Sequence, residues 1–197
     1  AHPVKRGRPI AKGTLSIHQA VVFCLFLLAM TGLFCLLVFR LEYCLVVGLY
    51  LVLNLVYSFI LQKIPGINAA SVAMGFVLRV FAGAAIIDVS VSGWLAGLTF
   101  LLALFLSVSK RRCEIMSRVT AHDKGSSPGL AEIFLALACL GGYLAYTLWP
   151  AVIREHTAPH LYLTSAWVAL GIFRYLRIGF NPAGDCSPVS VLLKDRP

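Results

Sequence analysis

Two clusters of basic residues flank long apolar segments, and they are the side chains in this sequence best suited to chemistry. Four cations, Lys5, Arg6, Arg8 and Lys12, precede the first apolar segment, and three consecutive cations, Lys110, Arg111 and Arg112, follow the fourth. Lysine and arginine donate several hydrogen bonds from a positive charge, and the planar guanidinium can grip phosphate oxygens in bidentate fashion. The clusters would suit an anionic ligand or anionic lipid headgroups, and they are also what membrane topology requires.

The elements that must position these clusters are membrane-spanning helices. Hydrophobic residues make up 59% of the 197 residues and charged residues only 13%, whereas a soluble domain is about half apolar. A hydrocarbon core of about 30 Å takes roughly 20 helical residues to cross. Six segments meet this length, at approximately 15–37, 41–61, 68–87, 92–109, 130–149 and 159–177. We therefore expect an all-α integral membrane protein with a single domain over residues 1–197.

The positive charges are distributed unevenly between the two sides that these spans define. One side carries Lys5, Arg6, Arg8, Lys12, Lys63, Lys110, Arg111, Arg112, Arg118, Lys124, Arg174, Arg177, Lys194 and Arg196. The opposite side carries Arg40 and Arg154. Because cytoplasmic loops are enriched in Lys and Arg, we expect the basic face and both ends of this chain to lie in the cytoplasm.

Arg79 is a charge inside a predicted span. It lies about eleven residues into the segment, roughly 16 Å along the helix at 1.5 Å per residue. An ionisable residue at this depth normally faces a protein interior or a watery cavity. Two interpretations stay open: a structural arginine paired with a polar neighbour such as Asn54, or an arginine lining a polar cavity for a phosphate-bearing ligand.

Small residues in two spans predict close contacts between helices. Gly75 and Gly83 lie in the third span, and Gly141 and Gly142 lie in the fifth. Small residues let helix backbones approach each other in a bilayer. They indicate packing and not chemistry.

The string "HPVKRGRPIAKGTLS" stands at the entrance to the first span. It resembles the segment that follows the first aspartate-rich motif in the UbiA superfamily of membrane prenyltransferases, where K-x-R-P-[IL]-A-x-G recurs. Later strings look like the branch that contains decaprenyl-phosphate phosphoribosyltransferases: "YSFILQKIPGINAASVAMGFVLRVFAGAA", "FLSVSKRRCEI", "GIFRYL" and "LLKDRP". They follow the expected order over nearly all of the chain, and their combination is specific.

The resemblance implies a larger helix bundle than this chain supplies. Members of the superfamily have about nine transmembrane helices, and the aspartate-rich motif is expected before Ala1, just ahead of the segment matched by His2. The six spans would then be the third to eighth helices of a UbiA-like bundle, incomplete at both ends. By this interpretation the catalytic residues are unknown and no metal ligand is identified in the chain. Mg²⁺ is expected for the complete protein, and the chain by itself should be inactive.

The chemistry that the resemblance implies is transfer of 5-phosphoribose from phosphoribosyl pyrophosphate to a polyprenyl phosphate, with decaprenyl phosphate the expected acceptor. A phosphate oxygen of the acceptor attacks C1 of the ribose as diphosphate leaves, which would feed arabinan precursor synthesis for the cell envelope. Mg²⁺ and basic side chains stabilise the negative charge on the leaving group. The implied setting is the cell membrane, with no nucleic-acid partner and with the oligomeric state left open.

Ten residues are candidates for phosphate or substrate binding, Arg79 by its depth in the span and the others by the resemblance: Lys5, Arg6, Arg8, Tyr57, Lys63, Arg79, Lys110, Arg111, Arg112 and Glu114. The basic clusters could instead serve topology or anchor a helix end, and Glu114 could be a local salt-bridge partner. Two positions depart from the family pattern. Gln62 stands where a lysine is usual, with Lys63 one place later, and Asn68 stands where an aspartate is expected. The shifted lysine would point elsewhere unless the helix has already ended, and Pro65 makes an early end reasonable.

Two other functions compete with this one. A UbiA-type prenyltransferase acting on a prenyl diphosphate and an aromatic acceptor would need a second aspartate cluster in the loop after Ser109, and the loop has none. A non-catalytic membrane protein could use the same basic face to bind anionic lipid. Arg79 weighs against this function, because binding of lipid at the membrane surface does not need a charge at mid-bilayer.

Overall fold

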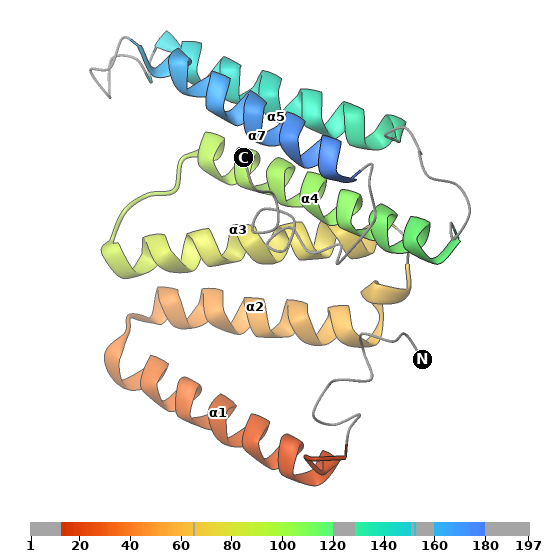
Figure 1. Ribbon diagram of the computed structural model, residues 1–197. Helices are drawn as coiled ribbons and strands as arrows, with labels where there is room; N and C mark the ends of the chain where they lie inside the picture. Colours follow the sequence, from red (N-terminus) through yellow and green to blue (C-terminus); the bar gives the residue numbers. More distant parts are fainter. Residues whose placement is uncertain (1–12, 65, 120–128, 151, 153–159, 180–197) are drawn as a thin grey trace.

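The computed structural model describes residues 13–64, 66–119, 129–150, 152 and 160–179. Over these residues the fold is all helical, as expected (Figure 1). The elements are α1 (Ile17–Val38), α2 (Leu41–Phe59), η2 (Leu61–Lys63), α3 (Ile67–Ile87), α4 (Gly93–Val119), α5 (Leu130–Leu148), η3 (Leu161–Leu163) and α7 (Thr164–Gly179).

Five helices are long and apolar enough to cross a bilayer: α1, α2, α3, the Gly93–Cys113 part of α4, and α5. The chain is a multi-pass membrane protein. The sixth expected span, 159–177, is shorter than predicted, because its α-helical part, α7, has only 16 residues. It is preceded by the 3₁₀ turn η3, and the hydroxyl of Thr164 donates to the carbonyl of Leu161 in that turn. Such local side-chain bonds compete with regular α-helical pairing at a helix start.

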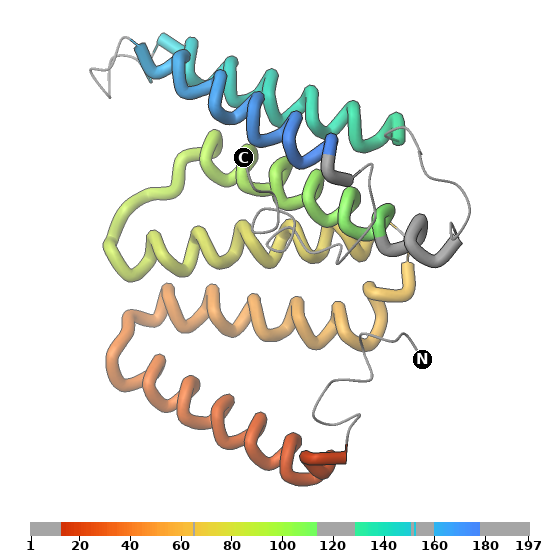
Figure 2. The backbone as a smooth tube through the Cα atoms, in the orientation of Figure 1, coloured from red at the N-terminus to blue at the C-terminus, as the bar shows by residue number. Residues whose placement is uncertain are grey.

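Helices that follow one another in sequence lie side by side in space and run in opposite directions (Figure 2). The helix α3 packs against α2 and α4, α4 packs against α5, and α7 packs against α5 and α4. The start of α1, the turn η2, the end of α4 and the start of α5 therefore share one end of the molecule. We call this end the basic end, because Lys63 of η2 and the Lys110–Arg112 triplet of α4 lie there.

The best-packed part of the molecule is a core between α4, α5 and α7. Its buried members are Phe105, Ala136, Cys139 and Ile172. The ring of Phe105, only 1% exposed, meets the ring of Tyr175 edge-on at 5.6 Å between centroids. This core holds the end of α4 and the start of α5 in a fixed relation.

The opposite end of the molecule has the features of a membrane interface. The indole of Trp94 lies 5.6 Å from the ring of Trp149 and 6.2 Å from that of Tyr146, between ring centroids. Amphipathic aromatic rings gather at the level of lipid headgroups. At the same end, Arg40 and Asp88 form an exposed ion pair of 2.9 Å. Among the described residues, Arg40 is the cation at this end, in agreement with the charge asymmetry read from the sequence.

Candidate functional site

The structure brings four of the ten predicted site residues to the basic end: Lys63, Lys110, Arg111 and Arg112. Tyr57 lies near them in the last turn of α2, and Arg79 lies further along the bundle in α3. Lys5, Arg6 and Arg8 fall outside the described residues. Glu114 belongs to α4, but its side chain also falls outside the described part of the chain. Ligand binding by these residues stays a prediction.

The three consecutive cations of α4 have different surroundings. Lys110 is exposed, whereas Arg111 and Arg112 are half-buried. The Nη1 atom of Arg111 is buried and has no hydrogen-bond partner within the described part of the chain. A buried guanidinium donor without an acceptor is costly, so this atom marks a place where an anion would be stabilised.

Arg112 is held by a glutamate that sequence reasoning missed. Its Nη1 lies 3.3 Å from Oε2 of Glu132, a carboxylate only 10% exposed in the first turn of α5. The same Oε2 accepts the backbone N–H of Gly129 at 3.2 Å. An acidic residue three positions after a helix N-cap is a capping pattern, and "GLAE" at 129–132 could have revealed it.

Gly129 lies directly beside the Arg112 guanidinium. A Cβ atom placed on Gly129 would lie 1.9 Å from Nη1 of Arg112, while the φ angle of −69° is one that any residue adopts. A side chain at 129 would therefore displace the flexible end of Arg112 from its place beside the first turn of α5.

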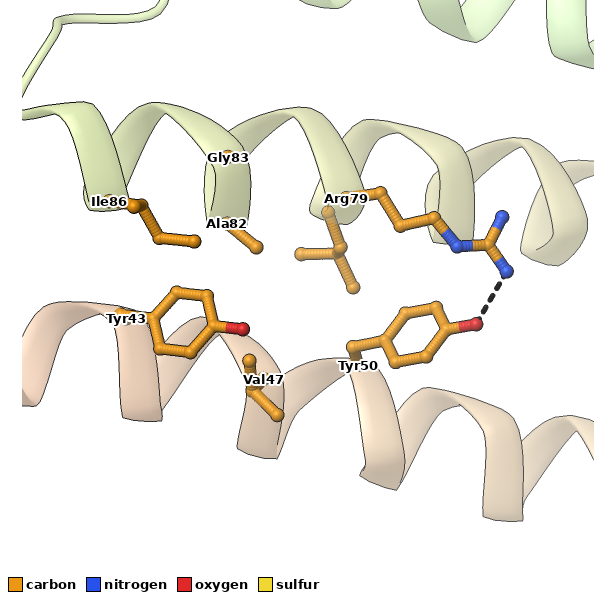
Figure 3. A pocket seen from close by; sticks show the side chains of 8 residues that line it. Tyr43, Val47, Tyr50, Arg79, Ala82, Gly83 and Ile86 are labelled. Carbon is orange, nitrogen blue, oxygen red and sulfur yellow. Dashed lines mark hydrogen bonds between the residues drawn. The ribbon is translucent and has the colours of Figure 1, made fainter. Parts of the chain in front are cut away.

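Arg79 lies between α2 and α3 with its guanidinium against Tyr50 (Figure 3). Its Nη2 donates to the Tyr50 hydroxyl at 2.5 Å, and its Cζ lies 5.1 Å from the Tyr50 ring centroid and 4.9 Å from that of Phe76. The expected partner was wrong, because Asn54 instead donates to the backbone carbonyl of Tyr50 at 2.7 Å. The tyrosine lies one helical turn before Asn54, on the side of α2 that faces α3.

A pocket of about 290 Å³ adjoins this pair, and its lining is mainly apolar. It is lined by Tyr43, Val47, Tyr50, Leu78, Arg79, Ala82, Gly83 and Ile86. Arg79 therefore pairs with a polar neighbour, as the first interpretation expected, and it also lines a cavity, while the expected binding of a phosphate-bearing ligand there stays a prediction. The cavity offers one cation and two phenol rings in otherwise apolar surroundings.

Tyrosines repeat at heptad spacing along the face of α2 that meets α3: Tyr43, Tyr50 and Tyr57. Each meets a residue of α3 from a matching series at 82, 75 and 68. Tyr43 and Ala82 line the same pocket, a Cβ on Gly75 would lie 3.7 Å from Cε2 of Tyr50, and the Tyr57 hydroxyl donates to Oδ1 of Asn68 at 3.4 Å. Seven residues are close to two helical turns, so this spacing keeps one face of the helix on its neighbour. We call this contact the tyrosine seam.

The two departures from the family pattern meet at the basic end of the tyrosine seam. Nδ2 of Asn68 donates to the backbone carbonyl of Gln62 at 3.0 Å, and the Gln62 side chain donates to the carbonyl of Ser58. The helix α2 ends at Phe59, before Gln62 and Lys63, as an early end at Pro65 predicted. Lys63 lies in the 3₁₀ turn η2, after α2 has ended, so the helical phase of α2 does not set its direction. Its side chain is exposed.

The described residues offer no obvious metal site, because no three His, Cys, Asp or Glu side chains converge within them. They therefore do not fit the magnesium ion that the resemblance implies for the complete protein. Binding of anions at the basic end by guanidinium and ammonium groups stays a prediction.

The aspartate-rich motif that the resemblance places before Ala1 stays a prediction. Ala1 falls outside the described residues. No position of this chain is assigned a catalytic role.

Comparisons with known proteins find similar proteins whose names state an enzymatic activity. No family model matches the chain. The decaprenyl-phosphate phosphoribosyltransferase of Corynebacterium glutamicum is 27% identical over 205 residues, 99% of this chain and 61% of the relative. The protein of the same name from Mycolicibacterium smegmatis is 28% identical over 213 residues, 100% of this chain and 66% of the relative. This chain is similar to proteins named decaprenyl-phosphate phosphoribosyltransferase.

The resemblance drawn from the sequence strings to this branch of the UbiA superfamily is therefore confirmed. The chain spans about three-fifths to two-thirds of the length of these relatives. An uncharacterized protein of Sinorhizobium fredii is also similar, with 30% identity over 175 residues, 85% of this chain and 34% of that protein. No solved structure matches.

Proposed function

We propose that this protein is a membrane transferase that moves 5-phosphoribose from phosphoribosyl pyrophosphate to a polyprenyl phosphate such as decaprenyl phosphate. The observation that carries the proposal is the similarity, over nearly the whole chain, to proteins named decaprenyl-phosphate phosphoribosyltransferase. The product would be an activated pentose on a lipid carrier, suited to arabinan precursor synthesis for the cell envelope.

The proposed step exchanges one bond at the anomeric carbon. A phosphate oxygen of the acceptor forms a bond to C1 of the ribose, and the bond from C1 to the diphosphate oxygen breaks, with both electrons leaving on the diphosphate. Negative charge therefore grows on the leaving group. Fixed donors aimed at that charge favour the transition state. The Nη1 of Arg111, which is buried without a hydrogen-bond partner among the described residues, supports a role of this kind for the basic end.

The membrane supplies the second substrate. Side chains such as Leu25 (62% exposed) and Phe134 (72% exposed) present an apolar surface in which an isoprenoid tail is soluble. The acceptor's phosphate would meet the water-soluble donor at the basic end. By the positive-inside rule this end faces the cytoplasm, and the cell membrane is the proposed location.

Magnesium stays an expectation for the complete protein. The described residues do not fit a metal site, so no step proposed here depends on one. Loss of transfer on addition of a chelator to the complete gene product, with recovery on excess Mg²⁺, would support the expectation.

The proposal is tested by transfer of radiolabelled phosphoribose to decaprenyl phosphate, using the complete gene product in detergent. We expect label in the lipid fraction and, for Arg111→Ala, a fall in kcat/KM of about 100-fold. A hydrogen bond to a charged group contributes about 1.5–3 kcal/mol, and about 1.4 kcal/mol corresponds to tenfold.

Arg40→Ala is the matched control, because Arg40 lies in an exposed ion pair at the opposite end. It should retain full activity. Absence of phosphoribosyl transfer, together with consumption of a prenyl diphosphate and an aromatic acceptor, would replace the proposed donor. Salt-sensitive binding to any anionic lipid without transfer would reject an enzymatic function.

A further inference from the structure

Two neighbouring cations of α4, Arg111 and Arg112, have different surroundings: Arg112 is paired with Glu132, and Arg111 has a buried donor without a partner among the described residues. We call the ion pair between Arg112 and Glu132 the latch. We propose that Glu132 is a positioning residue that clamps Arg112 and so aims Arg111 at the phosphate groups of the substrate. This inference rests on the proposed function and refines it, because Arg112 was expected to bind phosphate itself.

The clamp on Arg112 consists of two donors that converge on one carboxylate oxygen. Oε2 of Glu132 accepts from Nη1 of Arg112 at 3.3 Å and from the amide of Gly129 at 3.2 Å. The Glu132 side chain is 10% exposed and that of Arg112 is 30% exposed. Removing a charge from water is unfavourable unless the charge is paired and hydrogen-bonded, so these contacts hold each other in place.

Gly129 lies next to the guanidinium of Arg112. A Cβ at 129 would lie 1.9 Å from its Nη1, and the flexible end of the arginine would have to move to relieve that contact. The guanidinium of Arg112 therefore lies against the first turn of α5.

Arg111 has the opposite character. Neighbouring residues of an α-helix project about 100° apart, so Arg111 does not share the direction of Arg112. Its Nη1 is buried without an acceptor in the described part of the chain. A phosphate oxygen would supply the missing acceptor and compensate the charge in one contact.

The connection between the two arginines is the backbone of α4. Because the residues are consecutive, fixing Arg112 against α5 also fixes the rotation of α4 at the turn that carries Arg111. Arg111 then keeps one orientation before substrate arrives, which lowers the ordering cost of binding. Glu132 does not need to touch the substrate to affect its affinity.

The test measures binding of inorganic pyrophosphate, a mimic of the leaving group, to the complete gene product by calorimetry. We expect Arg111→Ala to weaken binding about 100-fold, the loss of a charge-assisted contact. Arg112→Ala and Glu132→Gln should each weaken it about tenfold, and so should the double variant, because both changes open the same latch. Adding Glu132→Gln to Arg111→Ala should change nothing further.

A second measurement reads the latch without any ligand. Hydrogen exchange of the amides in the first turn of α5 should become faster in Glu132→Gln and in Arg112→Ala and stay unchanged in Arg111→Ala. Arg112→Lys keeps the charge and should recover part of the protection. A structural defect of the whole bundle would instead accelerate exchange in every helix.

Two results would overturn the inference. If Arg112→Ala weakens pyrophosphate binding as strongly as Arg111→Ala and adds to the effect of Glu132→Gln, Arg112 is itself a binding residue. If exchange in α5 does not respond to either latch variant, there is no latch. Failure of the wild type to bind pyrophosphate would count against the proposed function and the role of Arg111, while the exchange experiment would still decide the latch.

Discussion

The tyrosine seam between α2 and α3 and the core between α4, α5 and α7 are two different solutions to helix packing in a membrane. In α2 no residue is buried, and its contacts with α3 include hydrogen bonds from Tyr57 to Asn68 and from Arg79 to Tyr50. The core is built from Phe105, Ala136, Cys139 and Ile172, all at most 8% exposed. The seam contains polar pairs and leaves the residues of α2 partly exposed, whereas the core is apolar and closed.

The difference matters for where a substrate could be held precisely. Groups that bind or orient a reactant work best when rigid elements support them. The Lys110–Arg112 triplet continues the helix that carries Phe105, so the core supports it directly. Arg79 depends on a single hydrogen bond and two ring contacts in the seam. The core side of the molecule is therefore the better foundation for the anion site.

The largest effect that separates the two regions should come from Phe105→Ala. Truncating a fully packed phenylalanine leaves a cavity and loses van der Waals contacts, which are also lost in a bilayer, at a cost of about 3 kcal/mol. Phe173→Ala is the control on α7, because that ring is 66% exposed. Unfolding in mixed micelles of increasing SDS content measures both. Equal losses for the two variants would mean that the core is no better packed than the lipid-facing surface.

A smaller effect is expected in the tyrosine seam from Tyr50→Phe, which deletes the acceptor of Arg79 and keeps the ring. Hydrogen bonds between helices in membranes contribute about 0.6 kcal/mol on average and at most about 1.7, so a loss of about 1 kcal/mol is expected. A double-mutant cycle with Arg79→Met in the same SDS assay should return a coupling of this size.

Tyr43→Phe provides the matched control on the same face of α2. Tyr43 lines the same pocket, and its hydroxyl has no hydrogen bond within the described part of the chain. This variant should be near neutral. If it costs as much as Tyr50→Phe, the loss reflects the phenol's position in the seam and not its bond to Arg79.

Much of this architecture was predictable because the bilayer imposes simple demands. Apolar length predicted the helices, and the uneven placement of Lys and Arg predicted which helix ends lie together. The sixth span, around α7, was predicted too long, since hydropathy cannot distinguish an α-helical turn from the 3₁₀ turn at Leu161–Leu163.

The contacts between helices were harder to predict. Arg79 was recognised as a residue needing a partner, but the choice of Tyr50 over Asn54 depends on how α2 is rotated against α3. The heptad spacing of the tyrosines in α2 indicated which face of that helix meets α3. The capping role of Glu132 could be read from the local sequence, but its ion pair with Arg112 could not, because the two residues lie on different helices. The assignments of Lys5, Arg6, Arg8 and Glu114, and the aspartate-rich motif expected before Ala1, stay predictions.

The smallest effect concerns adjacent glycines where α5 meets α4. Alanine is favoured over glycine in a helix by about 0.5–1 kcal/mol, and Gly141→Ala should gain most of this, because a Cβ there meets nothing within 4 Å. At Gly142 a Cβ would lie 3.2 Å from Cδ2 of Leu98, so the leucine must shift and the gain should be cancelled. The same SDS titration compares the pair. Equal stabilisation by both substitutions would show that the close approach of α4 to α5 at Gly142 is not part of the packing that the core maintains.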